Sequence, residues 1–186
     1  MNKNFLDSAF LILALAAMPA AMAQGNAYDN PAATGEQVKS VIEVGTVNTS
    51  NYDATITLLE TLRGPQAMQR LLAADPATRP PNTGYEYLIA RIRFALEGRA
   101  VSDQGTFVLG SSTFQWVANA ADFRQYDSVT ATPPGPVLQG PVRAGETAEG
   151  WLVFAVEQHE GKPILTFDPA SGGATGRGNI VFFKLY

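Results

Sequence analysis

Apolar and polar residues alternate with a period of two along much of the chain. Segment 85–96 directs Arg91 and Arg93 to one side and its apolar residues to the other, namely Leu88, Ala90, Ile92, Phe94 and Leu96. Segment 52–62 alternates in the same way. Because successive side chains of a β-strand point to opposite faces of a sheet, both segments predict strands with one dry and one wet face. Antiparallel sheets permit this arrangement far more readily than parallel sheets.

Further strands are predicted between clusters of turn-forming residues, at 99–102, 106–110, 112–118, 151–156, 163–167 and 179–186. In segment 112–118 the alternation places Phe114 and Trp116 on one face. The long connection 128–146 is rich in proline and glycine, which makes a continuous helix there implausible.

One helix is predicted between early strands, in the segment GPQAMQRLLAADP. Pro65 occupies a favourable first-turn position, and Met68, Leu71 and Leu72 recur at helical spacing. The pair Asp75–Pro76 ends the helix, because the residue before a proline avoids the helical region. We expect the helix to pack on the sheet, as a plug over one end. An apolar patch awaiting a partner is the alternative.

The hexapeptide WLVFAV, residues 151–156, is apolar at every position. It is too short for an independent helix and lies between predicted turns, so we expect a buried strand. One alternating set of its side chains would face a core shared by two sheets, and the short helix would cover the other set. A partner-binding surface is the alternative. The predicted core residues are Ile92, Phe94, Trp151, Val153 and Phe154.

The first 23 residues resemble a secretory signal peptide. A polar start containing Lys3 precedes an apolar run, and the small-residue pattern before Gln24 predicts cleavage between Ala23 and Gln24. A membrane anchor is less consistent with the sequence, since a spanning helix needs roughly 20 apolar residues. Residues 24–34 lack periodicity and predict a flexible lead-in, which leaves one domain over residues 35–186.

The composition limits where the protein can be located in the cell and which classes of partner it can bind. The chain has no cysteine, which suits a bacterial exported protein and excludes a lipid-modified cysteine. We therefore expect a secreted or periplasmic protein with no membrane anchor after signal cleavage. The net charge is −4 and the basic residues are scattered, whereas a nucleic-acid-binding protein would show a basic stripe. No nucleic-acid partner is expected.

The residue types that carry catalysis are sparse and dispersed. His159 is the only histidine and falls in a predicted hairpin turn, without a G-x-S-x-G elbow to meet it. The segment SGGATGRG lacks the lysine of a phosphate-binding loop. Glu146 and Glu149 are the nearest candidates for paired carboxylates, but a turn position favours solvated charges. We expect no enzyme activity, no cofactor and no metal, with a loop-assembled calcium site as an alternative.

The order of motifs resembles that of a known family. The motifs are LRGPQAMQRL, NTGYEYLIARIRF, GPVRAGETAEGWLVFAV, KPILTFDP and NIVFFKLY. They are similar to those of bacterial extracellular immunoglobulin-like domains of unknown function, which are related in fold to a secreted mycobacterial immunoprotective antigen. The resemblance covers about residues 35–186. It implies an exported, immunoglobulin-like antiparallel β-sandwich, often anchored through a lipidated N-terminus, for which this chain lacks the cysteine.

The function expected from these observations is that of a non-catalytic, exported β-sandwich domain. It would bind a protein or envelope component, an unknown macromolecule in the envelope or extracellular space. Tyr52, Tyr85 and Tyr87 are its candidate contact face, because tyrosine is favoured at interfaces; ordinary cross-strand packing is the alternative. A small-ligand or metal-binding accessory module of the envelope is the alternative function, followed by a hydrolase with a loop-assembled site.

Overall fold

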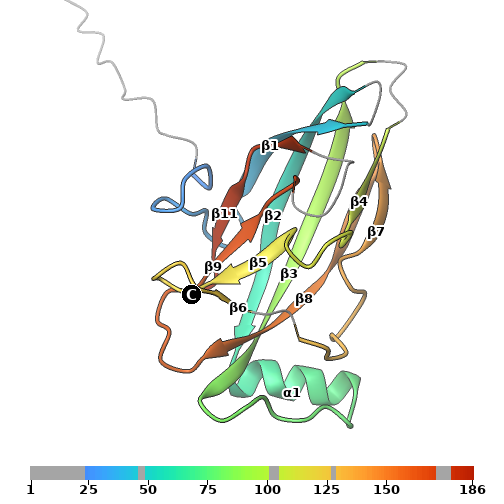
Figure 1. Ribbon diagram of the computed structural model, residues 1–186. Coiled ribbons are helices and arrows are strands. Elements are labelled where there is room, and N and C mark those ends of the chain that lie inside the picture. Colours follow the sequence, from blue (N-terminus) through green and yellow to red (C-terminus); the bar gives the residue numbers. More distant parts are fainter. Residues whose placement is uncertain (1–23, 46–48, 101–104, 127–128, 171–176) are drawn as a thin grey trace, which may run out of the picture.

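The computed structural model describes residues 24–45, 49–100, 105–126, 129–170 and 177–186. Within these ranges the chain forms the strands β1–β11 and the helix α1 (Figure 1). Every pairing between these strands is antiparallel. The all-β, antiparallel class predicted from the alternation is therefore confirmed, as is the single short helix between early strands.

The larger sheet has five strands in the order β10-β1-β2-β3-β8. These are β10 (Arg177–Gly178), β1 (Gln37–Val44), β2 (Ser50–Arg63), β3 (Tyr85–Gly98) and β8 (Thr147–Glu157). The alternation predicted for β3 holds, since its apolar set from Leu88 to Leu96 is fully buried while Arg91 and Arg93 are exposed. Because β8 ends the sheet, one of its edges has no neighbouring strand of this sheet.

A second layer faces this sheet and consists of two smaller sheets. A four-stranded sheet has the order β11-β9-β5-β6, and β4 pairs with β7 in a two-stranded sheet (Figure 1). Their strands are β4 (Thr106–Leu109), β5 (Trp116–Asn119), β6 (Gln125–Tyr126), β7 (Gly140–Arg143), β9 (Ile164–Phe167) and β11 (Val181–Lys184). Neither β1 nor β7 was predicted from the sequence.

The main core lies between the two layers. Phe94 of β3 stacks on Phe107 of β4, with 5.6 Å between ring centroids, and meets Phe167 of β9 edge-on at 5.8 Å. All three phenylalanines are at most 1% exposed. These contacts join three sheets, so this core holds the layers together.

The hexapeptide 151–156 packs on both sides of the larger sheet. Phe154 and Val156 lie in the main core, whereas Trp151 and Val153 belong to a second apolar cluster on the outer face. The helix α1 (Pro65–Ala74) crosses that face at one end of the sheet and contributes Leu71 (Figure 1). The helix therefore packs on the second set of side chains, as predicted. Segment 129–131 also packs on this set, which was not predicted.

The helix turns a slightly different face inward than its spacing predicts. Leu71 and Ala67 are fully buried and Met68 is half-buried, whereas Leu72 is 38% exposed. Pro65 occupies the first turn as predicted, and the backbone N–H of Asp75 donates to the carbonyl of Leu71 to close the last turn. Residues one apart on a helix point about 100° away from each other, so Leu71 and Leu72 cannot both face the sheet.

The prediction of a flexible lead-in over 24–34 is wrong where Tyr28 and Ala32 pack against the second layer. Ala32 is fully buried, and its N–H donates to the carbonyl of Phe182 at 2.9 Å. The hydroxyl of Tyr28 donates to the carbonyl of Ala120 at 2.7 Å. The segment pairs with the edge of β11 without regular alternation, so periodicity gives no sign of it. The predicted signal peptide, residues 1–23, lies outside the described residues.

The strand predicted at 112–118 begins later than expected. Trp116 is 5% exposed and starts β5, but Phe114 is 60% exposed. The residues before Trp116 form a turn held by the side chain of Gln115, which accepts from the N–H of Gly110 at 2.7 Å and donates to the carbonyl of Val108 at 3.1 Å. This local hydrogen bonding replaces the ladder that the alternation predicted. The strand predicted at 99–102 falls partly outside the described residues.

Arg63 fastens the turn that follows β8. Its guanidinium binds the carboxylate of Glu86 and donates to the carbonyl oxygens of Glu157 at 2.9 Å and Glu160 at 2.5 Å. The Arg63 side chain is 24% exposed, so these groups are largely shielded from water. A planar guanidinium presents several donors at once, which suits it to this position.

Replacing Arg63 by alanine is expected to lower the free energy of unfolding by about 1–3 kcal/mol, because partly buried acceptors lose their donor. Urea denaturation of the purified protein measures the change. Arg99→Ala is the matched control, since among the described residues Arg99 pairs with Asp53 on the exposed surface, and exposed ion pairs contribute little. Equal effects of the two substitutions would contradict the role assigned to Arg63.

Candidate functional site

An apolar pocket of about 230 Å³ opens at the free edge of β8. Four consecutive residues of β8, Trp151–Phe154, line it. Because neighbouring side chains of a strand point to opposite faces, a pocket that touches all four must open at the edge of the strand. We refer to it as the edge pocket.

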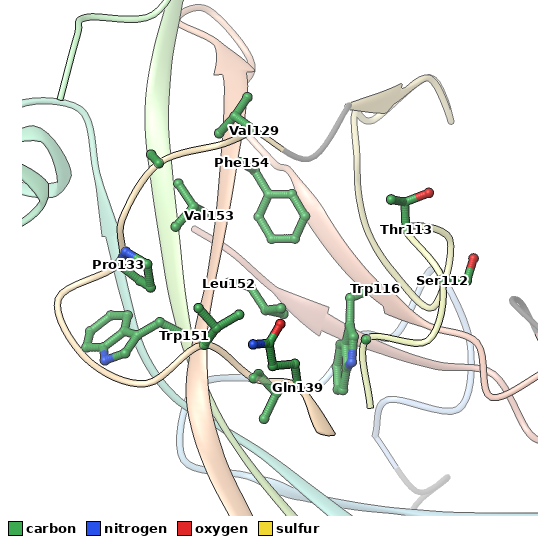
Figure 2. Close-up of a pocket in the computed structure, with 14 residues that line it drawn as sticks. Ser112, Thr113, Trp116, Val129, Pro133, Gln139, Trp151, Leu152, Val153 and Phe154 are labelled. Carbon is green, nitrogen blue, oxygen red and sulfur yellow. The ribbon is translucent and has the colours of Figure 1, made fainter. Parts of the chain in front are cut away.

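The other walls of the edge pocket come from the second layer and from one long connection. Trp116 of β5 and the turn at Ser112 and Thr113 form one side, and residues 129–139 form another (Figure 2). We call residues 129–139 the strap. The chain has two tryptophans, Trp116 and Trp151, and both line this pocket. Residues distant in sequence therefore converge on one small apolar space.

The strap is fastened to the edge of β8 at Trp151. The N–H of Trp151 donates to the carbonyl of Pro136 at 2.8 Å, and the N–H of Leu138 donates to the carbonyl of Trp151 at 3.1 Å. Val137 and Trp151 thereby form an isolated parallel bridge. The strap acts as a very short additional strand at this point and fixes one wall of the pocket.

Gly150 allows the strap to approach so closely. A Cβ atom at this position would lie 2.6 Å from the backbone nitrogen of Leu138 and 2.7 Å from its Cα. Real Cβ atoms do not approach backbone atoms to such distances, so any larger residue would push the strap away. The glycine is required here by the space and not by the backbone conformation.

The described lining of the edge pocket is mostly apolar with a few polar groups. None of the described residues that line it is ionisable, and its polar groups include the side chains of Ser112, Thr113 and Gln139. The indole Nε1 of Trp116 is buried and forms no hydrogen bond within the part of the chain that the structure describes. The arrangement is suited to binding.

The predicted tyrosine contact face does not exist as such. Tyr52 is 1% exposed in the main core, where its hydroxyl accepts from the N–H of Gly105 at 2.8 Å. Tyr87 is 8% exposed, and its hydroxyl donates to the carbonyl of Arg79 at 2.8 Å. Only Tyr85, at 37%, remains exposed. Tyr52 has the same parity as the buried Ala54, so the alternation itself assigns it to the core.

A charged cluster surrounds the turn that contains His159. The His159 side chain is 83% exposed, with its Nε2 3.4 Å from a carboxylate oxygen of Glu157. Hydrogen bonds from Arg124 lower the pKa of Glu157 and also that of Asp122. The predicted turn position of His159 is thus observed, and an exposed histidine of this kind lacks the shielding that catalytic sites provide.

The two glutamates considered for paired carboxylates lie outside any pocket described above. Glu149 binds the guanidinium groups of Arg91 and Arg93 on the outer face of the sheet. Glu146 accepts from the backbone N–H of Arg143 at 2.9 Å. Among the residues that the structure describes, no three His, Cys, Asp or Glu side chains are grouped so that they could hold a metal ion.

A second hollow, of about 460 Å³, lies further along β8 and is more polar. Pro80, Tyr85, Tyr126 and Ala155 are among its lining residues, and Val129 lines both hollows. Burial, with Glu157 and Glu160 adding to it, raises the pKa of Tyr126. This hollow is larger, and of the strap it touches only Val129 among the described residues. The edge pocket is therefore the stronger candidate.

Sequence analysis missed most of the site. The strap was expected to be only a connection, and Trp116 was placed on a strand without a role. One signal was available: the only two tryptophans of the chain flank a proline-rich segment. Aromatic side chains commonly line ligand pockets, but the convergence of these two depends on long-range packing that alternation does not encode.

Comparisons with known proteins identify no family. No protein-family model and no curated protein matches the chain. Among solved structures, the chain is similar to ycdA, a candidate lipoprotein of Bacillus subtilis subsp. subtilis str. 168, and to the yjhA protein of Bacillus subtilis. Both comparisons give a TM-score of 0.47 and 13% sequence identity, over 70% and 74% of this chain respectively. The chain spans 35% of ycdA and 82% of yjhA.

In the part of the chain that the structure describes, no helix has both the length and the apolar character needed to cross a bilayer.

Proposed function

We propose that this protein is an exported, non-catalytic binding module whose ligand site is the edge pocket. The observation that carries the proposal is the convergence of both tryptophans of the chain on one apolar pocket beside a fastened strap. Ligand sites are typically concave and mostly apolar, with a few polar groups that orient the ligand. The lining described above has this character and lacks ionisable groups.

A small ligand fits the site better than a large protein partner. The volume of about 230 Å³ is below the ~300–1,000 Å³ that is typical of pockets for drug-sized ligands. Two of the three tyrosines that supported a macromolecular contact face are buried. Of the functions left open by the sequence, a small-ligand accessory module of the envelope is therefore the one we propose.

The finer fold assignment and the location belong to the same proposal. Two facing layers of antiparallel sheet that share one core support an immunoglobulin-like sandwich of the bacterial extracellular family. The predicted signal peptide supports export to the periplasm or the medium. N-terminal sequencing of the exported protein is expected to begin at Gln24, and an intact Met1 on membrane-bound protein would contradict it.

Tryptophan fluorescence tests the proposed site directly, because both fluorophores line it. A set of small apolar and amide-bearing compounds is titrated into the purified exported protein, and both the emission and the melting temperature are measured. We expect at least one chemical class to shift the emission and raise the melting temperature. Thr113→Phe, which adds bulk to the pocket wall, should abolish the response. Failure of every compound, or an unchanged response in the variant, would contradict the proposal.

Binding at the edge pocket is expected to be independent of pH for an uncharged ligand. No ionisable side chain among the described residues lines the pocket, so protonation near neutral pH is expected to change none of these contacts. Affinities measured by calorimetry at pH 5.5 and pH 8 should agree within about twofold, because each tenfold change requires about 1.4 kcal/mol. A large difference would indicate that an ionisable group outside the described lining takes part.

A further inference from the structure

The backbone of β8 presents hydrogen-bonding groups alternately to its two edges. The N–H of Gln158 donates to the carbonyl of Gly84, and the register pairs Leu152 with Ala90 and Phe154 with Leu88. The even-numbered residues of β8 therefore bond to β3. Trp151 bonds in the opposite direction, to the strap. Val153, two residues further on, must point its N–H and C=O to the same free edge as Trp151.

Among the described residues, neither of these two backbone groups of Val153 has a partner. No hydrogen bond to either is formed within the described residues, although the Val153 residue is only 9% exposed and lines the edge pocket. Buried backbone groups are nearly always paired, with protein or with something else. The strap pairs with the edge at Trp151 and then leaves it to form β7, so it does not reach this position.

We propose that the ligand of the edge pocket is an acylated amino-acid residue with an apolar side chain, which pairs with the backbone of Val153. The inference rests on the proposed function. In an antiparallel hydrogen-bonded pair, two residues exchange both N–H···O=C bonds. An acylated residue with an amide or peptide bond on its other side carries this complementary donor and acceptor on one unit.

The walls of the pocket determine which side chain the ligand carries. Trp116, Trp151 and Phe154 supply aromatic and apolar surface, and none of the lining groups is charged. An aliphatic or aromatic side chain gains from burial there, whereas a charged one would lose its hydration without finding a counter-ion. The volume admits one residue, so the occupant is a small N-acyl amino-acid amide. A longer peptide would have to pass Val129, which lines the wall shared with the next hollow.

Two matched probes test the inference. N-acetyl-L-leucine N′-methylamide carries both the donor and the acceptor, and its analogue methylated on the leucine nitrogen lacks the donor. Each is titrated into ¹⁵N-labelled protein while the Val153 amide and the two indole N–H signals are followed by NMR. We expect the first probe to bind with a millimolar Kd and to shift the Val153 signal. The methylated probe should bind at least about fivefold more weakly, as expected for one lost hydrogen bond.

Each outcome decides between the inference and the proposed function. Equal binding of the two probes at the indole signals would overturn the pairing with Val153 and leave the edge pocket as a ligand site. If neither probe binds while other compounds do, the pairing with Val153 is likewise overturned and the edge pocket remains a ligand site. A tripeptide, acetyl-Ala-Leu-Ala-methylamide, distinguishes the source, since tighter binding than that of the single residue would overturn the small-ligand assignment. Failure of all compounds would overturn both.

A substitution on the protein side complements the probes. Val153→Pro removes the N–H that faces the free edge and spares every bond to β3, and proline is tolerated on edge strands in this orientation. We expect this variant to bind both probes at least about fivefold more weakly, because the probe carbonyl loses its donor. It should keep its preference for the unmethylated probe, since the carbonyl of residue 153 still accepts from the leucine N–H. Should it fail to fold, the comparison of the two probes on the unmodified protein still decides the question.

Discussion

Replacing Phe94 by alanine is expected to lower the free energy of unfolding by about 3–5 kcal/mol, the usual cost of truncating a buried phenylalanine. Phe94 is fully buried, stacks on Phe107 and meets Phe167 edge-on. Its loss removes contacts with two other sheets at once, and the strands on either side cannot collapse into the cavity. Urea denaturation followed by circular dichroism measures the change.

Phe114→Ala is the matched control for this substitution. Phe114 is 60% exposed in the turn before β5, although the alternation predicted it on the face of Trp116. Its truncation should change the free energy of unfolding by no more than about 0.5 kcal/mol, as is usual at the surface. A large loss at Phe114, or a small one at Phe94, would contradict the placement of the core between the two layers.

Replacing Gly150 by valine is expected to displace the strap and to abolish ligand binding at the edge pocket. The new Cβ would lie 2.6 Å from the backbone nitrogen of Leu138, so the hydrogen bonds that join Pro136 and Leu138 to Trp151 cannot persist. We expect the free energy of unfolding to fall by about 1–3 kcal/mol, the usual cost of forcing extra atoms into a packed site. The tryptophan emission should also change, because Trp151 loses part of its cover.

Gly161→Val serves as the control, since nothing lies within 4 Å of the position of its Cβ in the turn before β9. It should leave both the emission and the binding of probes unchanged. A crystal structure of the Gly150→Val protein would show the strap directly. Retention of the strap on β8 in that structure, with normal binding, would contradict the role that we assign to Gly150.

Alternation predicted the parts of the fold in which one sheet face is buried along a whole strand. It assigned the inner face of β3 correctly, and the doubly apolar hexapeptide 151–156 indeed packs on both of its faces. The helix was predicted because Pro65 and Asp75–Pro76 delimit it in the sequence. These features are local, so the sequence displays them directly.

Features that depend on distant segments were not predictable in this way. The lead-in is ordered by hydrogen bonds to β11, which lies at the other end of the chain. Phe114 leaves the sheet because Gln115 binds the backbone of its own turn. The edge pocket requires Trp116, Trp151 and the strap to meet, and no spacing rule connects them. Tyr52 differs from these cases, because it shares the parity of the buried Ala54 and the alternation itself indicates burial.

Amide hydrogen exchange along β8, measured residue by residue by NMR, tests most directly whether the edge of this strand is closed at Trp151 and open at Val153. The amides of Leu152 and Phe154 bond to β3, and that of Trp151 bonds to Pro136. We expect the Val153 amide to exchange at least about tenfold faster than these three, since it has no acceptor among the described residues. Equal protection at all four positions would show that the edge is already paired and would contradict the account.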